Sequence, residues 1–179
     1  MLKLENTVLV IVDVQEKLSR VMYEKERLFE NLQKLIKGAR ILGIPIILTE
    51  QNPKGLGPTI IEIANLLPNI KPIPKFSFSC FGDEKFLKEL KASKRKQVLI
   101  AGIEAHVCVY QTAVDLVNSG YEVQVVADGV SSRTLENKQI GLEKVRSEGI
   151  GVTSTETALF ELLRVAEGEK FKELLKVVK

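Results

Sequence analysis

Histidine and cysteine are scarce in this chain, which limits the catalytic sites it can hold. Among 179 residues there are one histidine, His106, and two cysteines, Cys80 and Cys108. Residues two apart in one segment do not generally face each other, so His106 is a poor partner for Cys108, and a Cys–His or Ser–His triad is not expected. The two cysteines lack the spacing of a zinc site or a disulfide framework and favour a reducing cytoplasm. We expect no metal and a cytoplasmic location.

Long apolar runs and strongly basic regions are also missing. No stretch of about twenty consecutive apolar residues occurs, so we expect no membrane-spanning helix. The first six residues are mixed in character and do not resemble a signal peptide. The net charge is +3 with dispersed basic residues, which does not indicate a nucleic-acid-binding surface. We expect one domain over residues 1–179, a small-molecule substrate, and neither nucleic acid nor membrane as partner.

Apolar runs typical of buried strands alternate with segments of helical periodicity. The runs predict strands at residues 7–12, 44–48, 98–101, 121–127 and 150–153. The periodic segments predict helices at residues 26–42, 59–66, 83–92, 135–147, 155–165 and 169–178. Such alternation indicates a three-layer, Rossmann-like α/β fold, with a mostly parallel sheet of about six strands and helices on both faces.

The segment at residues 97–112, QVLIAGIEAHVCVYQT, joins a buried strand to a helix and contains Cys108. A cysteine at the start of a helix lies near free backbone N–H groups and the positive end of the helix dipole. Both favour the thiolate, which is the nucleophilic form. The alternative is that Cys108 is a small core residue, which is common for a free cysteine.

Two charged residues also follow strand-like segments. Asp13 ends the run at residues 7–12, and Lys75 lies in the proline-interrupted segment at residues 70–81. In a parallel sheet both would meet Cys108 at the carboxyl edge, where the carboxylate could act as base and the ammonium as counter-charge. The alternatives are that Asp13 caps the turn that follows it and that Lys75 is a solvated loop residue.

Three long segments carry a resemblance to a known family. VLVIVDVQ surrounds Asp13, KFSFSCF begins at Lys75, and AGIEAHVCVYQTAVDLVNSGYEVQVVADGVSSR contains Cys108. They resemble the isochorismatase-like cysteine hydrolases, which include nicotinamidases and carbamoyl-amide hydrolases, from about residue 7 to the helix at residue 155. TEQNPKGLGPT and GIEAHVCV are most similar to the isochorismatase domain-containing proteins.

The resemblance implies an Asp13–Lys75–Cys108 triad that hydrolyses a C–N bond of a small amide, carbamoyl or ureido compound through a thioester. It also implies a cis peptide before Glu104, so that the N–H groups of Glu104 and Cys108 form an oxyanion hole. A homo-oligomer without a cofactor is expected. The alternative is a catalytically silent binding or redox-sensing protein of the same fold.

The chain departs from the metal-containing nicotinamidases after its second predicted strand. Those enzymes carry an aspartate and two histidines in a D-x-H-P context, whereas this chain has Glu50-Gln-Asn52-Pro53. No imidazole-based metal site is therefore expected, and the nicotinamidase interpretation is weakened. The true isochorismatases need no cysteine at the nucleophile position, so Cys108 favours amide-type chemistry.

Three further side chains are candidates for the substrate pocket: Gln15 in the VDVQ motif, Phe76 after Lys75, and His106 between Glu104 and Cys108. Phe78 and Phe81 could extend the aromatic wall that begins at Phe76. The alternatives are an outward-facing His106 and core positions for the phenylalanines.

Overall fold

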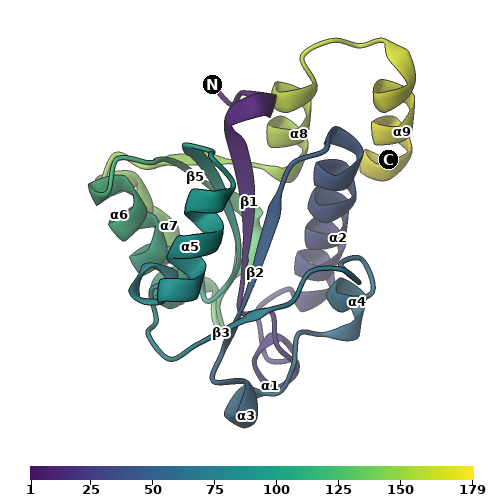
Figure 1. The fold of residues 1–179 in the computed structure, drawn as a ribbon. Coiled ribbons are helices and arrows are strands. Elements are labelled where there is room, and N and C mark those ends of the chain that lie inside the picture. The colour runs from purple at the N-terminus through teal and green to yellow at the C-terminus, as the bar shows by residue number, and fades with distance from the viewer.

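The computed structural model describes all 179 residues, which form a six-stranded sheet covered by helices on both faces (Figure 1). Every strand pair is parallel, and the spatial order is β3-β2-β1-β4-β5-β6. The strands are β1 (Thr7–Val12), β2 (Ile46–Gln51), β3 (Ile73–Lys75), β4 (Gln97–Ile103), β5 (Glu122–Ser131) and β6 (Gly151–Thr153). The predicted α/β fold is confirmed.

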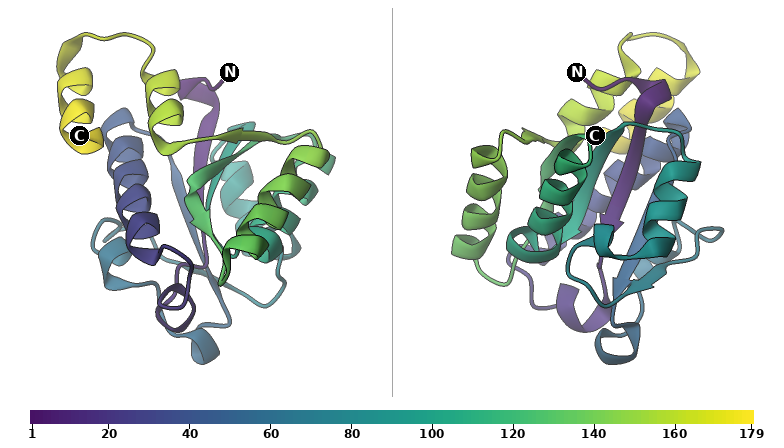
Figure 2. Two further views of the ribbon diagram at one scale, coloured as in Figure 1. Left: turned by 180° about the vertical axis from the view of Figure 1, so that it is seen from behind. Right: turned by 60° about the vertical axis from the view of Figure 1, so that its left-hand side comes forward.

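Helices cover the two faces of the sheet as separate layers (Figure 2). One layer holds α2 (Lys25–Leu42), α4 (Ile61–Ala64), α8 (Thr155–Leu163) and α9 (Gly168–Val178), and the other holds α5 (Glu84–Ala92), α6 (Tyr110–Asn118) and α7 (Leu135–Ser147). Short helices α1 (Glu16–Ser19) and α3 (Pro53–Leu56) lie in the connections after β1 and β2. Each layer has its own buried apolar cluster, which explains why β1 and β4 are buried along their whole length and are apolar after their first residues.

Helix ends follow the sequence signals closely. The Asp83 carboxylate accepts hydrogen bonds from the N–H groups of Lys85 and Phe86, and so caps α5 as predicted. Gly43 ends α2 in the left-handed conformation, at a φ of 77°, which glycine adopts without strain. The predicted helix at residues 59–66 is shorter in the structure, where α4 spans only Ile61–Ala64.

Strand boundaries differ from the prediction where pairing, not hydrophobicity, defines the strand. β2 continues to Gln51 because its last three residues pair with β3, which the prolines at residues 70–81 had concealed. β5 continues past Ala127 because Val130 and Ser131 pair with the end of β4 after a register shift. Both extensions lie at the carboxyl edge of the sheet. No helix in the chain combines the length and apolar character needed to cross a membrane.

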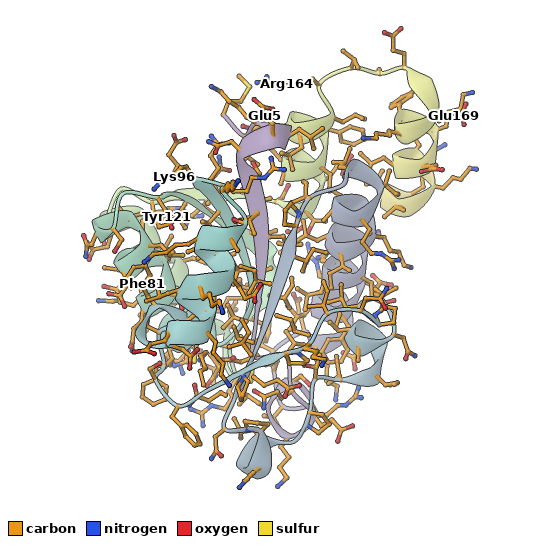
Figure 3. All side chains as sticks on the ribbon, viewed as in Figure 1. Glu5, Phe81, Lys96, Tyr121, Arg164 and Glu169 are labelled. Carbon is orange, nitrogen blue, oxygen red and sulfur yellow. The ribbon has the colours of Figure 1, made fainter.

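The two ends of the sheet differ in character. At the amino ends of the strands, the Lys96 ammonium lies 4.7 Å from the centre of the Tyr121 ring, in a surface contact (Figure 3). At the carboxyl ends, β4 is joined to α6 by a single π-helical turn, η3 (Ala105–Val109), and β3 leads to a 3-10 turn, η2 (Cys80–Gly82). The chemically distinctive residues are at this second end.

Candidate functional site

Asp13 and Lys75 form a buried ion pair at the carboxyl edge of the sheet. Asp13 directly follows β1 and Lys75 is the last residue of β3. The Lys75 Nζ lies 2.7 Å from Asp13 Oδ2, and both side chains are fully buried. Two charges are costly to bury unless each has a partner, so the two residues depend on each other. Lys75 is therefore not a solvated loop residue, and the Asp13 carboxylate points at Lys75 instead of capping the following turn.

The ammonium of Lys75 makes three hydrogen bonds besides its contact with Asp13. It donates to Gln51 Oε1 (2.8 Å), to the Ser77 carbonyl (3.1 Å) and to the Phe78 carbonyl (2.9 Å), which accounts for all three of its protons. The 2.7 Å contact with Asp13 Oδ2 has the length of a charge-assisted interaction, and it is the one close side-chain contact that the hydrogen bonds of the chain leave to Oδ2. Burial is the largest single effect and lowers the pKa of Lys75, but the opposing effects, led by the negative charge of Asp13, together exceed it, and the net direction is upward. Lys75 therefore stays charged.

Thr49 fixes the other carboxylate oxygen. Its Oγ1 donates to Asp13 Oδ1 at 2.8 Å, and its carbonyl accepts the Asp13 N–H at 3.2 Å. Asp13 Oδ1 is thus bound by Thr49, and Oδ2 faces Lys75. Sequence reasoning missed Thr49 and Gln51. The available signal was the same as for Asp13, namely polar residues at the carboxyl end of an apolar run.

Cys108 lies in the η3 turn with its side chain 6% exposed. Burial above all, and then the charge and hydrogen bonding of Asp13, raise the pKa of its thiol to about 12, although Lys75 acts in the opposite direction. The resting form is therefore the neutral thiol next to a carboxylate. The expectation that the helix start would favour a thiolate is wrong, because burial and the carboxylate outweigh the dipole.

Backbone groups before Cys108 have an unusual arrangement. The Ile103–Glu104 peptide bond is cis, as the family resemblance implies, and the Glu104 N–H donates to no atom of the chain. The Glu104 carboxylate is held by the N–H and the Nε of Arg133, at 3.0 and 3.3 Å. Gly102 has a φ of 118°, and a Cβ there would collide with the backbone of Val12. A glycine is therefore required for the ends of β1 and β4 to approach each other beside Asp13.

The three predicted pocket residues have different surroundings. Gln15 is fully buried, and its amide bonds the backbone of Gln51 twice and of Gly57 once, at 2.8 to 2.9 Å. It therefore anchors the loop after β2, whereas we had expected a substrate contact. His106 is half-buried, with Nδ1 2.9 Å from Ser132 Oγ. Phe76 is 77% exposed and does not belong to the core, and its contact with a substrate stays a prediction.

The other two phenylalanines of that loop differ from each other. Phe78 is 55% exposed, while Phe81 is half-buried against the apolar cluster under α5, α6 and α7. The core interpretation therefore describes only Phe81. The Phe78 ring therefore lies at the surface, although the carbonyl of the same residue accepts a hydrogen bond from the buried Lys75.

Cys80 is a second thiol in the same region, which sequence reasoning did not assign to the site. It is fully buried in η2, with Sγ 3.7 Å from Thr49 Oγ1, and its N–H donates to Thr112 Oγ1 at 2.9 Å. Burial first, and then Asp13, raise the pKa of this thiol to about 11. Its loop has neither helical nor strand periodicity, so the sequence offered no signal for its position.

The last residues of β2 do not fit a metal ion. Glu50 Oε1 accepts hydrogen bonds from both the N–H and the Oγ1 of Thr59, each at 2.7 Å. The Gln51 amide is divided between Lys75 and the Phe76 carbonyl. No group of three or more histidine, cysteine, aspartate or glutamate side chains in the chain is arranged to hold a metal.

Comparison with known proteins identifies relatives along nearly the whole chain. The sequence model of the isochorismatase domain matches residues 7–157. The chain is 39% identical over 178 residues to isochorismatase domain-containing protein 2 of Danio rerio, covering 99% of this chain and 89% of the relative. No activity is stated in that name.

Solved structures with the same fold include proteins of different description. A structure of the MAR1 ribonuclease from Caenorhabditis elegans has 35% identity and a TM-score of 0.93, and covers 99% of this chain and 91% of that one. The YcaC gene product of Escherichia coli, described as an octameric hydrolase of unknown specificity, has 24% identity and a TM-score of 0.93, with 98% and 88% covered. At that identity the second likeness supports the fold alone.

Proposed function

Because the chain belongs to the isochorismatase family, we propose that it is a cysteine-dependent hydrolase of small amide, carbamoyl or ureido compounds. The observation that carries this proposal is the buried Cys108 thiol beside the Asp13 carboxylate, which in turn is paired with the buried Lys75. A thiol nucleophile needs a base, and the Asp13 carboxylate is the proposed one. The Lys75 ammonium, 2.7 Å from Oδ2, supplies the counter-charge to this carboxylate.

The proposed reaction has two halves. In the first, Asp13 takes the proton of Cys108 while Sγ attacks the carbonyl carbon, and the N–H groups of Glu104 and Cys108 bind the developing oxyanion. Collapse of the intermediate breaks the C–N bond, Asp13 returns the proton to the leaving nitrogen, and a thioester remains on Cys108. In the second, Asp13 removes a proton from water, the water attacks the thioester, and the proton goes to the departing sulfur. The enzyme returns to its starting state.

The high pKa of the Cys108 thiol is consistent with this order of events. A thiol with a pKa of about 12 does not ionise by itself near neutral pH, so proton transfer to Asp13 must accompany the attack. The same property argues against a redox sensor, because sensor cysteines are exposed and have lowered pKa values. The redox-sensing alternative is therefore disfavoured, while a catalytically silent binding protein of the same fold stays the alternative that turnover measurements test.

Assembly and domain organisation belong to the same proposal. The YcaC structure is described as octameric, and we propose a homo-oligomer for this chain too, in which residues 1–179 act as one domain. Light scattering on the purified protein measures the number of copies. A monomer at all concentrations would contradict this part of the proposal without affecting the chemistry.

The proposed activity is tested by turnover on small primary amides, carbamoyl compounds and ureido compounds, with single-stranded RNA in the same series because one relative is named a ribonuclease. We expect hydrolysis of at least one C–N compound, a loss on the order of a millionfold in Cys108→Ala, and little change in Cys80→Ala. Cleavage of RNA alone, or full activity of Cys108→Ala, would contradict the proposal.

A further inference from the structure

Glu104 is held at two of its polar groups while its backbone N–H stays free. Its carbonyl accepts hydrogen bonds from the N–H groups of Val107 and Val109, at 3.1 and 3.2 Å, which closes η3 around Cys108. Its carboxylate accepts hydrogen bonds from the N–H and the Nε of Arg133, at 3.0 and 3.3 Å. The Glu104 N–H donates to no atom of the chain. The direction of this N–H is therefore set by what binds the rest of the residue.

Residues 131–133 contact the end of β4 and the η3 turn at three successive positions. The first of them pairs with the last residue of β4. Ser132 Oγ lies 2.9 Å from His106 Nδ1, and Arg133 binds the Glu104 carboxylate. The arginine is thus the last of three consecutive contacts between the end of β5 and the turn that contains the nucleophile.

The connection after β1 and helix α7 hold both sides of this contact in place. The Ser131 hydroxyl donates to the Tyr23 carbonyl at 2.7 Å, and the Tyr23 N–H donates to the Ser132 carbonyl at 2.8 Å. On α7, a Cβ at Gly141 would lie 2.7 Å from the carbonyl carbon of Ala105, so glycine is required for the helix to approach η3 this closely. The end of β5 and the η3 turn are therefore each fixed by their own surroundings.

The Arg133–Glu104 ion pair is buried on one side only. The Glu104 side chain is 9% exposed, whereas the Arg133 side chain is 60% exposed. A nearly buried carboxylate without a partner is costly, and here its negative charge would lie on the residue whose N–H is the proposed oxyanion donor. Arg133 offsets that charge and holds the carboxylate in one place through two hydrogen bonds.

We propose that Arg133 is a positioning residue for the hydrolysis, which fixes the Glu104 carboxylate and thereby directs the Glu104 N–H to the oxyanion that forms at Cys108. This inference rests on the proposed function. The side-chain and backbone hydrogen bonds of Arg133 to the Glu104 carboxylate are the contacts through which it acts. Oxyanion donors work within about 3 Å of the developing charge, and a misplacement of about 1 Å can cost roughly 100-fold in rate.

Two other roles for Arg133 predict different kinetics. A surface ion pair that only supports the fold contributes little and would leave kcat unchanged. Binding of a substrate anion by the two terminal guanidinium nitrogens, which make no hydrogen bond in the chain, would show as a higher KM in the variant with kcat unchanged. The positioning role predicts the opposite division, with a lower kcat and little change in KM.

The test is Arg133→Met, measured on the C–N compound that the wild type hydrolyses. We expect kcat to fall by about 10- to 100-fold and KM to change by less than about threefold, because the donor is displaced and not removed. In a Cys80→Ala background, alkylation of Cys108 by iodoacetamide should keep its rate, because that reaction forms no oxyanion. Glu104→Gln/Arg133→Met should have the kcat of Arg133→Met or a higher one, since the second change removes the unpaired charge.

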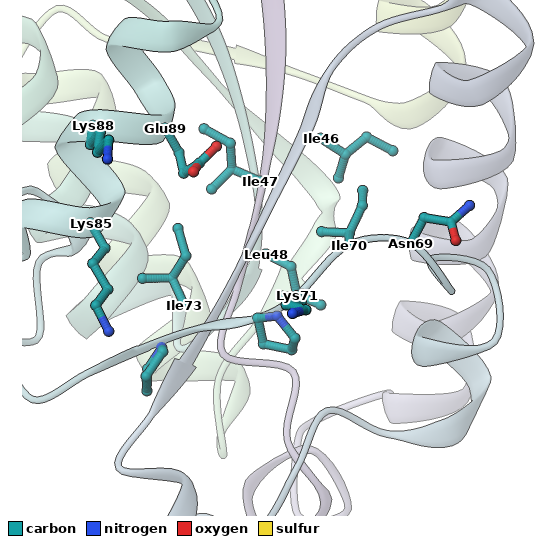
Figure 4. Close-up of a pocket in the computed structure, with 12 residues that line it drawn as sticks. Ile46, Ile47, Leu48, Asn69, Ile70, Lys71, Ile73, Lys85, Lys88 and Glu89 are labelled. Carbon is teal, nitrogen blue, oxygen red and sulfur yellow. The ribbon is translucent and has the colours of Figure 1, made fainter.

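Two matched controls separate this effect from the loss of an ion pair or of a positive charge. Arg20→Met breaks another surface arginine–glutamate pair, in which Arg20 Nη1 lies 2.8 Å from Glu62 Oε1. Lys88→Met removes an exposed lysine from the cavity of about 620 Å³ between α5 and residues 69–72 (Figure 4). The residues that line this cavity include no member of the proposed triad, of η3 or of residues 131–133. Both controls should keep the wild-type kcat and KM.

Several kinetic results would overturn the inference. An unchanged kcat in Arg133→Met would do so, as would a rise in KM alone, which indicates direct contact with the substrate. Equal losses in Arg133→Met and Arg20→Met would show a general effect of breaking an ion pair. A further loss of kcat in Glu104→Gln/Arg133→Met would show that the arginine does not act through Glu104.

The backbone amide signal of Glu104 gives a readout that needs no substrate. It should move in Arg133→Met and stay in place in Arg20→Met and Lys88→Met. If it stays in place in Arg133→Met, the positioning role is wrong even when no compound is hydrolysed. Turnover of Cys108→Ala tests the proposed function separately, so a failure of that function and a failure of this inference can be told apart.

Discussion

The two turns that contain a cysteine, η2 and η3, lie near the same Asp13–Lys75 ion pair but have different surroundings. Cys80 in η2 is fully enclosed, with Thr49 at its sulfur and Thr112 at its N–H. Cys108 in η3 is 6% exposed and follows Glu104, whose N–H is free. Burial and Asp13 raise the pKa of both thiols, to about 11 and about 12. The pKa values therefore do not distinguish the two thiols. They differ in exposure, and only Cys108 follows a residue whose backbone N–H is free.

This difference means that reactivity here depends on what surrounds the thiol more than on its resting ionisation. In the proposed mechanism, a substrate that reaches Cys108 also meets the Asp13 carboxylate as base and the free N–H of Glu104 as a donor to the developing charge. Cys80 is fully buried, so a substrate cannot reach it without displacing the side chains that enclose it. Three changes test this contrast, in order of decreasing expected effect.

Replacing Asp13 with asparagine should separate turnover from thiol acidity. We expect turnover to fall by about 100- to 10,000-fold, because the base is lost. The Asp13 charge raises the pKa of the Cys108 thiol, so its removal should lower that pKa. Alkylation of Cys108 by iodoacetamide should then become faster at pH 8 even as turnover falls, because more thiolate is present.

The alkylation is measured against pH in a Cys80→Ala background, so that only Cys108 contributes. In the otherwise unchanged protein the rate should keep rising above pH 9, towards the raised pKa. Asp83→Asn, at the start of α5, is the matched control and should leave the profile unchanged. Parallel losses of turnover and alkylation in Asp13→Asn would show that the site had collapsed.

Removing Lys75 should destabilise the whole fold. Lys75→Met leaves the Asp13 carboxylate buried without its partner, which costs about 3–5 kcal/mol in the free energy of unfolding. The double variant Asp13→Asn/Lys75→Met should be more stable than Lys75→Met alone, because no unpaired charge remains. Urea unfolding measures both. The exposed Lys85→Met should change stability by no more than about 0.5 kcal/mol, and a similar loss in both lysine variants would contradict the account.

Thr49 and Thr112 allow the two turns to be perturbed separately. Thr49→Val removes the hydrogen bond to Asp13 Oδ1 and should cost about 1.5–3 kcal/mol of stability and lower turnover. Thr112→Val leaves the Cys80 N–H unsatisfied and should cost about 1–3 kcal/mol without a loss of turnover. Urea unfolding and steady-state kinetics on both variants give the comparison. If Thr112→Val lowers turnover as much as Thr49→Val, the Cys80 turn belongs to the reacting site.

Much of the fold followed from local pattern. The helix at residues 135–147 and the strand at residues 7–12 have the boundaries that periodicity and apolar runs predicted. Asp13 and Lys75 were found because parallel strands bring their carboxyl ends together. β3 was not found, because three residues with a proline among them form a strand only through their pairing with β2.

The direction of the thiol pKa could not be predicted from sequence, because it depends on how deeply Cys108 is buried. A helix start favours the thiolate, yet the fold encloses this cysteine and places a carboxylate against it. The exposure of Phe76 was also hidden, since the backbone turns its side chain outward while its carbonyl binds Gln51. Both the pKa of Cys108 and the exposure of Phe76 depend on contacts between segments that are far apart in the sequence, which local patterns do not reveal.

The central claim is that Cys108, and not Cys80, forms the covalent bond to the substrate. The direct measurement is mass spectrometry of the protein quenched during turnover, followed by digestion and mapping of the acylated peptide. The account predicts an acyl group on the peptide containing Cys108, its disappearance when substrate is exhausted, and its absence from Cys108→Ala. An acyl group on Cys80, or turnover without any adduct on a rapidly quenched Cys108, would contradict it.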